Sequence, residues 1–106
     1  MIKQTLAEWK KEAQDRFGEK TSEWKFRCSR CGNDQSASEF VEAGIKPEDA
    51  ISMVYQECIG RHGAKEVGCD WAAFGLLGTL GKGRIVFTPD GREVEVFDFA
   101  PVEVTQ

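Results

Sequence analysis

The chemistry that this 106-residue sequence offers most clearly comes from its four cysteines, Cys28, Cys31, Cys58 and Cys69. Cys28 and Cys31 are separated by two residues, and Gly32 follows directly. A turn of this kind lets two thiolates reach one ion at about 2.3 Å while backbone N–H groups moderate their charge. The second pair is more widely spaced, and the glycines near it allow the chain to fold back. The pattern predicts one Zn²⁺ held by all four thiolates.

Such a zinc would be structural, because four thiolates leave no open coordination position for a substrate or water. No other group of residues has the spacing of a catalytic site. Glu93 and Glu95 share a strand face that we expect to be solvated. Ser36 and Ser38 have no histidine at motif spacing. We therefore predict that the chain is not an enzyme.

Alternatives to this site stay open from the sequence. Cys28 and Cys31 could form a thioredoxin-like redox pair, although residues 32–36 indicate a loop where that motif needs a helix. Iron also fits four thiolates, and four inert buried cysteines are the simplest case. His62, the only histidine, could pair with Cys58 in the second half-site and leave Cys69 unused.

The composition limits the partners and the compartment. The formal charge of −4 would fall to about −6 with zinc bound to four thiolates, which is unlike the basic footprint of a duplex-DNA binder. No run approaches the roughly 18 apolar residues of a membrane helix, and the N-terminus is charged and amphipathic, unlike a signal peptide. We expect a cytoplasmic protein with no membrane partner, in a reducing compartment where cysteines at motif spacing bind metals.

The elements that position the cysteines begin with a helix over residues 5–17. Thr5 and Glu8 fit a capping box, and Gly18 is a plausible terminator. An apolar stripe marks the face that docks on the core. Its members are Ile2, Leu6, Trp9, Ala13 and Phe17.

The middle of the chain predicts a strand and two short helices. Residues 24–28 alternate between apolar and charged and lead into the first cysteine turn. Ser36 and Glu39 repeat the capping-box pattern and predict a helix that ends at Gly44. A further helix over residues 47–55 begins at a proline. Its inward residues should be Ile51, Val54 and Tyr55.

The last part of the chain predicts a buried strand over residues 69–77, although the pattern there also fits a helix. A glycine-rich loop follows. Residues 84–88 and 93–97 flank a turn and predict a β-hairpin. The fold class is therefore α+β: one zinc-stabilised domain over residues 1–106, with an N-terminal helix (residues 1–20) packing on it, short middle helices, and an antiparallel sheet ending in the hairpin. Residues 101–106 should form a tail.

Residues 56–61 and 68–76, together with the first cysteine turn, resemble a family of small uncharacterised phage and prophage proteins. The resemblance covers roughly residues 24–100. It implies a four-cysteine metal site on Cys28, Cys31, Cys58 and Cys69, and a bacterial or phage source. It implies no activity.

We predict a non-enzymatic interaction module, a phage or prophage accessory protein with an unidentified protein partner. The alternative is a zinc-knuckle-like binder of single-stranded nucleic acid, in which cations contact phosphates and aromatic rings stack on bases. Equally, the cations can offset the charge of a zinc–thiolate centre and the rings can be core residues. The residues concerned are the cations Lys25, Arg27, Arg30, Arg61 and Lys65 and the aromatic residues Trp24, Phe26 and Trp71.

Overall fold

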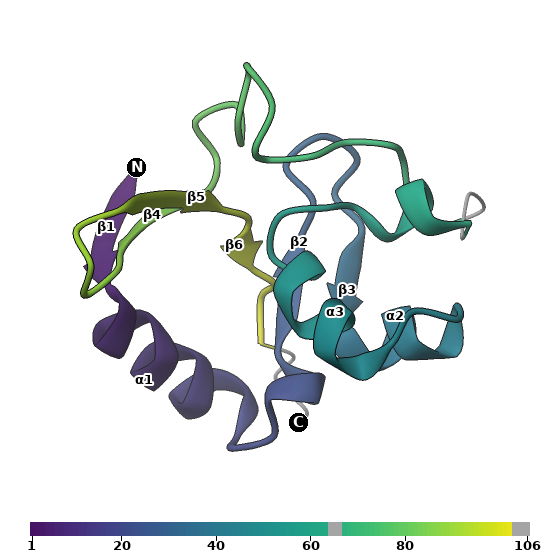
Figure 1. Cartoon of the computed structure of the whole chain (residues 1–106), viewed down its shortest axis with the longest axis horizontal. Helices are drawn as coiled ribbons and strands as arrows, with labels where there is room; N and C mark the ends of the chain where they lie inside the picture. The colour runs from purple at the N-terminus through teal and green to yellow at the C-terminus, as the bar shows by residue number, and fades with distance from the viewer. Residues whose placement is uncertain (64–66, 103–106) are drawn as a thin grey trace.

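The computed structural model describes residues 1–63 and 67–102. Within them the fold is α+β, with three α-helices and two three-stranded sheets. Figure 1 shows one sheet beside α1 and the other beside α2 and α3. In chain order, the elements are β1 (Ile2–Thr5), α1 (Leu6–Phe17), η1 (Thr21–Glu23), β2 (Lys25–Arg27), β3 (Asp34–Ser36), α2 (Ala37–Glu42), α3 (Pro47–Met53), η2 (Ile59–His62), β4 (Arg84–Phe87), β5 (Glu93–Val96) and β6 (Asp98–Phe99).

The first sheet has the order β1-β4-β5, and its β1–β4 pair is parallel. The expected single antiparallel sheet is therefore wrong, because the residues before Thr5 form a strand that pairs with β4. Ile2 belongs to this strand and is half exposed. The capping box of α1 is confirmed: the Glu8 N–H donates to Thr5 Oγ1 and the Thr5 N–H donates to Glu8 Oε1. Trp9 and Ala13 face the core, as their spacing predicts.

The second sheet, with the order β3-β2-β6, carries the centre of the core. Phe26 on β2 is opposite Gln35 on one side and Phe99 on the other. Its ring lies among those of Trp9, Tyr55 and Phe99, at centroid distances of 5.4–6.1 Å. This cluster joins α1 to the sheet that leads into the first cysteine turn.

Two details of the middle helices differ from the sequence expectation. Ser36 precedes α2, but its hydroxyl donates to the Glu39 carboxylate and caps no backbone N–H, so no capping box forms. In α3 the buried residue is Ala50, whereas Ile51 is 46% exposed. The helix ends at Met53, which leaves Val54 buried and Tyr55 partly buried, as predicted.

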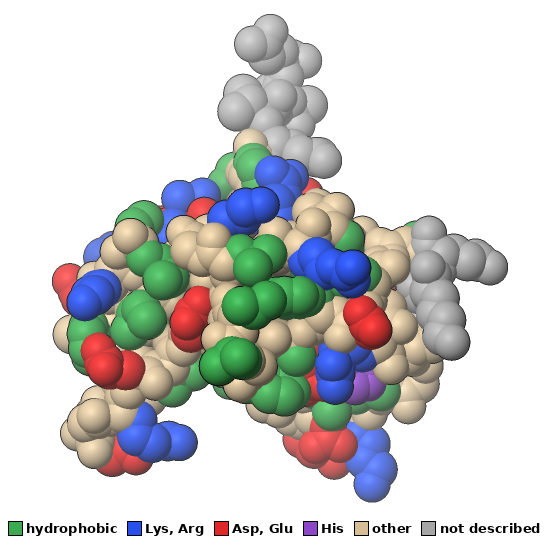
Figure 2. Space-filling model, turned by 90° about the horizontal axis from the view of Figure 1, so that it is seen from above, with side chains coloured by type: hydrophobic (Ala, Val, Ile, Leu, Met, Phe, Trp, Pro, Cys, Tyr) green, Lys and Arg blue, Asp and Glu red, His purple; other side chains and the backbone are tan. Residues whose placement is uncertain are grey.

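The predicted buried strand over residues 69–77 is wrong. Only an isolated bridge between Glu57 and Ala72 forms there, and successive turns follow. Gly75 donates to the Ala72 carbonyl and Gly78 to the Gly75 carbonyl, so the chain curls outward and does not extend. Figure 2 shows hydrophobic side chains gathered at the centre of the face seen from above. Those of this loop with the greatest exposure are Phe74, Leu76 and Leu77.

The C-terminal strands lie where the sequence places them, with β4 and β5 antiparallel and Arg84 opposite Val96. Glu95 is not part of a solvated face, because its carboxylate accepts hydrogen bonds from the N–H and the hydroxyl of Thr79. The chain continues from β5 into β6, which belongs to the second sheet, so the hairpin does not contain the last strand.

Of the predicted tail, residues 103–106 lie outside the described residues, and the division into one domain stays a prediction. No helix in the described part of the chain is long and apolar enough to cross a membrane.

Candidate metal centre

The first cysteine turn grows directly out of β2. The Cys28 N–H donates to the Asn33 carbonyl, and the Gly32 N–H donates to the Cys28 carbonyl, both at 2.9 Å. Gly32 has a φ of 77°, a conformation in which a side chain would be strained. The turn buries Cys28 and leaves Cys31 exposed. Two thiols three residues apart are thereby fixed at one end of the second sheet.

The second pair of cysteines meets because two glycines let their segments touch. A Cβ on Gly60 would lie 2.4 Å from the backbone N and O of Cys69, and one on Gly68 would lie 2.8 Å from Cys58 Sγ. The Cys58 N–H donates to the Trp71 carbonyl, and the Cys69 N–H lies 3.2 Å from Cys58 Sγ. The residues around Cys58 and Cys69 are therefore in contact, as the sequence predicted.

Gln35, which the sequence analysis did not single out, attaches the second cysteine segment to the sheet. Its side chain is fully buried and lies in β3, beside the first turn. The amide nitrogen donates to the carbonyls of Val54 and Glu57, and the amide oxygen accepts from the N–H of Ile59, each at 2.8 Å. These bonds satisfy groups on both sides of Cys58 that would otherwise be buried without partners.

The four sulfurs form one compact cluster. Cys28 Sγ lies 3.7 Å from Cys69 Sγ, Cys31 Sγ lies 3.7 Å from Cys58 Sγ, and all four atoms lie within 4.8 Å of one another. A tetrahedral ion with metal–sulfur bonds of about 2.3 Å needs sulfurs about 3.8 Å apart. The donor set and its spacing therefore fit one ion of the size and preference of zinc or iron.

The thiols already influence one another's protonation. The Cys28 thiol and the backbone N–H groups of Cys69 and Gly60 lower the pKa of Cys58 to about 5, against the effect of burial. The Cys58 sulfur, together with burial, raises the pKa of Cys28. Burial likewise raises the pKa of Cys31. The thiolate form is therefore favoured at Cys58 and the thiol form at Cys28 and Cys31, and a bound cation would favour the thiolate form of its ligands.

His62 lies outside this cluster. Among the described residues, the group able to hold an ion consists of the four cysteines. His62 Nε2 lies 3.2 Å from Glu57 Oε1, and its ring lies 5.7 Å from that of Phe40. The geometry thus favours Cys69 over His62 as the partner of Cys58.

The candidate cations fall into two groups, most of them paired with carboxylates. Arg27 forms two hydrogen bonds to the Asp34 carboxylate, at 2.7 and 2.9 Å, and shares a surface hollow with Lys25. Arg30 and Arg61 meet at Asp70: Arg30 Nη1 lies 3.4 Å from its carboxylate, and Arg61 Nη1 donates to its carbonyl at 2.8 Å. Lys65 lies outside the described residues.

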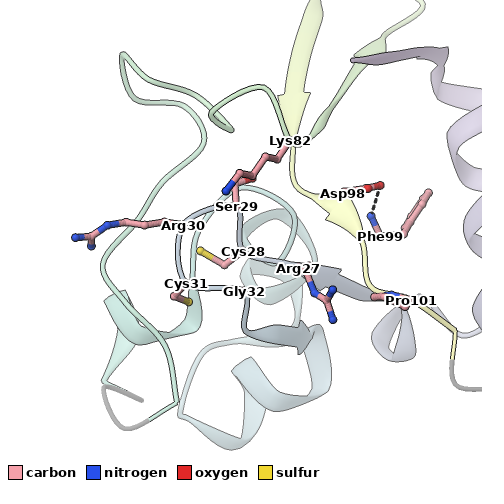
Figure 3. A pocket seen from close by; sticks show the side chains of 10 residues that line it. All are labelled: Arg27, Cys28, Ser29, Arg30, Cys31, Gly32, Lys82, Asp98, Phe99 and Pro101. Atoms are coloured by element: carbon pink, nitrogen blue, oxygen red, sulfur yellow. Dashed lines mark hydrogen bonds between the residues drawn. The ribbon is translucent and has the colours of Figure 1, made fainter.

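A hollow of about 350 Å³ lies over the first turn, with lining that includes Arg27, Arg30 and Lys82. Figure 3 shows that Arg27 and Arg30 extend away from the two thiols, in different directions, while Lys82 runs across toward Ser29. The first turn therefore does not gather its arginines into one patch.

The aromatic candidates separate in a similar way. Trp24 and Phe26 are buried and belong to the core, which removes them as surfaces for base stacking. Trp71 is partly buried, with the Arg30 guanidinium 5.8 Å from its ring centroid. Phe74, absent from the sequence-based candidates, is 61% exposed and lies 5.8 Å from the Arg61 guanidinium. Two arginine–aromatic contacts therefore lie on the loop beyond Cys69.

The comparisons with known proteins give one match. The model of the family described as VVA0879-like matches residues 5–100, which span every cysteine and nearly every element of the fold. No curated protein and no solved structure matches the chain.

Proposed function

We propose that this chain, which belongs to the VVA0879-like family, is a non-enzymatic interaction module built around one structural zinc ion. The observation that supports this proposal is the cluster of four cysteine sulfurs, within 4.8 Å of one another, contributed by two distant segments. Four thiolates would complete the coordination of the ion, so the metal would hold the fold and carry out no reaction.

Zinc is the ion we assign, because closed sites of four thiolates that join separate segments are typical of structural zinc. Iron is the other metal that the donor set fits. Binding of zinc would contribute directly to the free energy of folding. The main effect would fall on residues 67–80, because the structure describes no helix or strand within them.

The bound ion would hold the surface formed by the loop after Cys69 in one conformation. Trp71 follows Cys69 by two residues, and its indole N–H donates to the Gly78 carbonyl at 2.9 Å. The metal, Cys69 and Trp71 would thus hold the exposed apolar loop at residues 74–80 in one conformation. A loop that is already ordered loses less conformational entropy on binding a partner. We propose that this surface makes the contact with a protein partner.

Thermal unfolding of the wild type and Cys58→Ser, each with and without a chelator, tests the metal part of the proposal. Cys58 is fully buried in the cluster. The wild type should unfold at a lower temperature with chelator and recover when zinc is added. Cys58→Ser should unfold at low temperature in every condition. If Cys58→Ser matches the wild type with and without chelator, the zinc is not structural.

A second candidate function is binding of single-stranded nucleic acid. The observation that favours it is the pair of arginine–aromatic contacts, Arg30 with Trp71 and Arg61 with Phe74. Aromatic faces accept bases and arginines accept phosphates. Fluorescence anisotropy of a labelled single strand at low salt tests it. Binding that falls at least tenfold in the double variant Arg30→Ala, Arg61→Ala, but not in Lys11→Ala on α1, supports it; no binding by the wild type excludes it.

The cytoplasmic location and the phage or prophage origin expected from the sequence are part of the same proposal. The metal site and the exposed loop are proposed independently of this location and origin. Identification of the replicon that carries the gene tests the origin.

A further inference from the structure

The loop at residues 74–80 exposes four large apolar side chains to solvent. Leu76 is completely exposed, Leu77 and Phe74 are more than 60% exposed, and Leu80 is 42% exposed. Figure 2 shows hydrophobic side chains projecting together from the centre of this face. Contiguous apolar patches on a soluble chain mark interaction sites.

The base of this loop is firmly held, so its exposure is not a sign of local disorder. Thr79 is fully buried, and its N–H and hydroxyl donate to the Glu95 carboxylate. Its hydroxyl oxygen also accepts the N–H of Gly83 at 3.0 Å. A Cβ on Gly78 would lie 2.5 Å from Glu95 Oε2, so a side chain at this position would displace the carboxylate that holds Thr79. The leucines therefore project from a fixed support.

The backbone of the loop is also strained at one leucine. Leu80 has a φ of 58°, the only positive φ at a non-glycine residue in the described part of the chain. A leucine is unfavourable in this conformation, in which glycine would be unstrained. Strained residues of this kind concentrate at sites of function. Here the strain accompanies a leucine side chain that stays on the surface.

Charged residues of both signs lie around the patch. Arg61, over the Phe74 ring, lies 3.4 Å from the Glu57 carboxylate, and Arg30 is paired with Asp70. Glu93 lines the same hollow as Phe74, and Lys82 follows Leu80 by two residues. An anionic bilayer or a phosphate backbone binds a surface of net positive charge. A rim of mixed sign instead complements another rim of mixed sign.

We propose that the loop at residues 74–80 is covered by a second copy of this chain, in a symmetric dimer. In a two-fold interface each patch meets itself, so the leucines of both copies pack together while each rim can place cations opposite the other's carboxylates. The patch consists of four apolar side chains, whereas stable interfaces bury roughly 1,200–2,000 Å² in total. The dimer should therefore be weak and depend on concentration. This inference rests on the proposed function, since it names the protein partner of the module.

Sedimentation equilibrium of the zinc-loaded full chain tests the proposal over about a hundredfold range of concentration. The wild type should move from the mass of one chain toward that of two as concentration rises. The double variant Leu76→Asn, Leu77→Asn should weaken association at least tenfold. The control, Val41→Asn with Ile51→Asn, changes two exposed apolar residues outside the loop, on α2 and α3, which are 40% and 46% exposed, and should associate like the wild type.

Zinc content and near-ultraviolet circular dichroism, measured on the same samples, keep the outcomes distinct. A wild type that holds zinc but stays monomeric at every concentration overturns the dimer and leaves the metal module intact. Association of the Leu76→Asn, Leu77→Asn variant as strong as that of the wild type also overturns the dimer and leaves the metal module intact. If the monomer instead binds anionic vesicles or a labelled single strand through Leu76 and Leu77, the patch belongs to that partner and the dimer is wrong. A wild type without zinc overturns the proposed function itself.

Discussion

The side-chain oxygen of Gln35 accepts a hydrogen bond of 2.8 Å from the backbone N–H of Ile59, the residue that follows Cys58. Through this bond, a buried residue of β3 positions the second half of the cysteine cluster. The first half, Cys28 and Cys31, lies in the turn that joins β2 to β3. One short sheet therefore fixes both halves, and the metal would complete an arrangement that the backbone has already prepared.

We expect Gln35→Leu to lower both stability and zinc affinity. The change leaves the Ile59 N–H and the carbonyls of Val54 and Glu57 buried without partners, which should cost about 3 kcal/mol or more in the free energy of unfolding. Loss of the support for Cys58 should weaken zinc binding about tenfold. Urea unfolding and competition with a chromophoric chelator measure the two effects. Gln14→Leu, on the exposed face of α1, is the control, and equal zinc affinity in the two variants would contradict the role of Gln35.

Gly68→Ala should prevent the two cysteine segments from meeting. Its Cβ would lie 2.8 Å from both Cys58 Sγ and the Gly60 nitrogen. Since one of these atoms is a proposed metal ligand and the other belongs to the backbone, we expect purified Gly68→Ala to contain much less than one zinc per chain. At Gly75 the nearest atom to a new Cβ is 3.4 Å away, so Gly75→Ala should retain zinc. Full zinc occupancy in Gly68→Ala would show that the segments approach in some other way.

The ion pair between Glu12 and Arg84 should make stability depend on pH in the acid range. Arg84 is only 3% exposed and contacts the carboxylates of Glu12 and Asp98 at 2.7 Å. Burial acts to raise the pKa of Glu12, but hydrogen bonds from Arg84 and Gln4 and the charge of Arg84 lower it below 4.5. A carboxyl with a lowered pKa stabilises the fold above its ordinary pKa and loses that effect as pH falls through the lowered value.

Glu12→Gln should therefore be less stable than the wild type by about 2 kcal/mol at pH 7, and this gap should close as the pH falls below about 4. The comparison uses urea unfolding of both proteins at each pH, so that any acid-induced loss of metal affects both alike. Asp15→Asn, at an exposed pair with Lys11, should change stability by less than about 1 kcal/mol. A gap that stays constant with pH would contradict the assignment.

His62→Ala should keep its zinc, whereas Cys69→Ser should lose it. His62 is engaged with Glu57, and Cys69 Sγ lies 3.7 Å from Cys28 Sγ. Metal analysis of the two purified variants decides between these residues. The reverse pattern, with zinc lost from His62→Ala and kept in Cys69→Ser, would assign the second half-site to Cys58 and His62.

The parts of the fold that could be predicted from the sequence depend on neighbouring residues. Thr5 and Glu8 are three positions apart and set the start of α1 by a local exchange of hydrogen bonds. Cys28, Cys31 and Gly32 likewise form their turn from adjacent residues. The glycines at 60 and 68 indicated that the second segment folds back, because no other residue tolerates such close approach.

The parts that could not be predicted depend on distant partners. Ile2 pairs with Arg84, far along the chain, so nothing near Ile2 marks it as a strand residue. Gln35 gives no local sign that its amide will be buried against the Cys58 segment. Apolar composition at residues 69–77 indicated burial, yet the turns formed by Gly75 and Gly78 leave Phe74, Leu76 and Leu77 exposed. Composition records how apolar a segment is, but not whether the rest of the chain covers it.

X-ray absorption at the zinc edge of the freshly purified protein tests the central proposal most directly. The cluster of Cys28, Cys31, Cys58 and Cys69 predicts a zinc absorption edge and a single shell of four sulfurs at about 2.3 Å. A shell that includes a light atom at about 2.0 Å, as histidine would give, or well-folded protein without zinc, would contradict it.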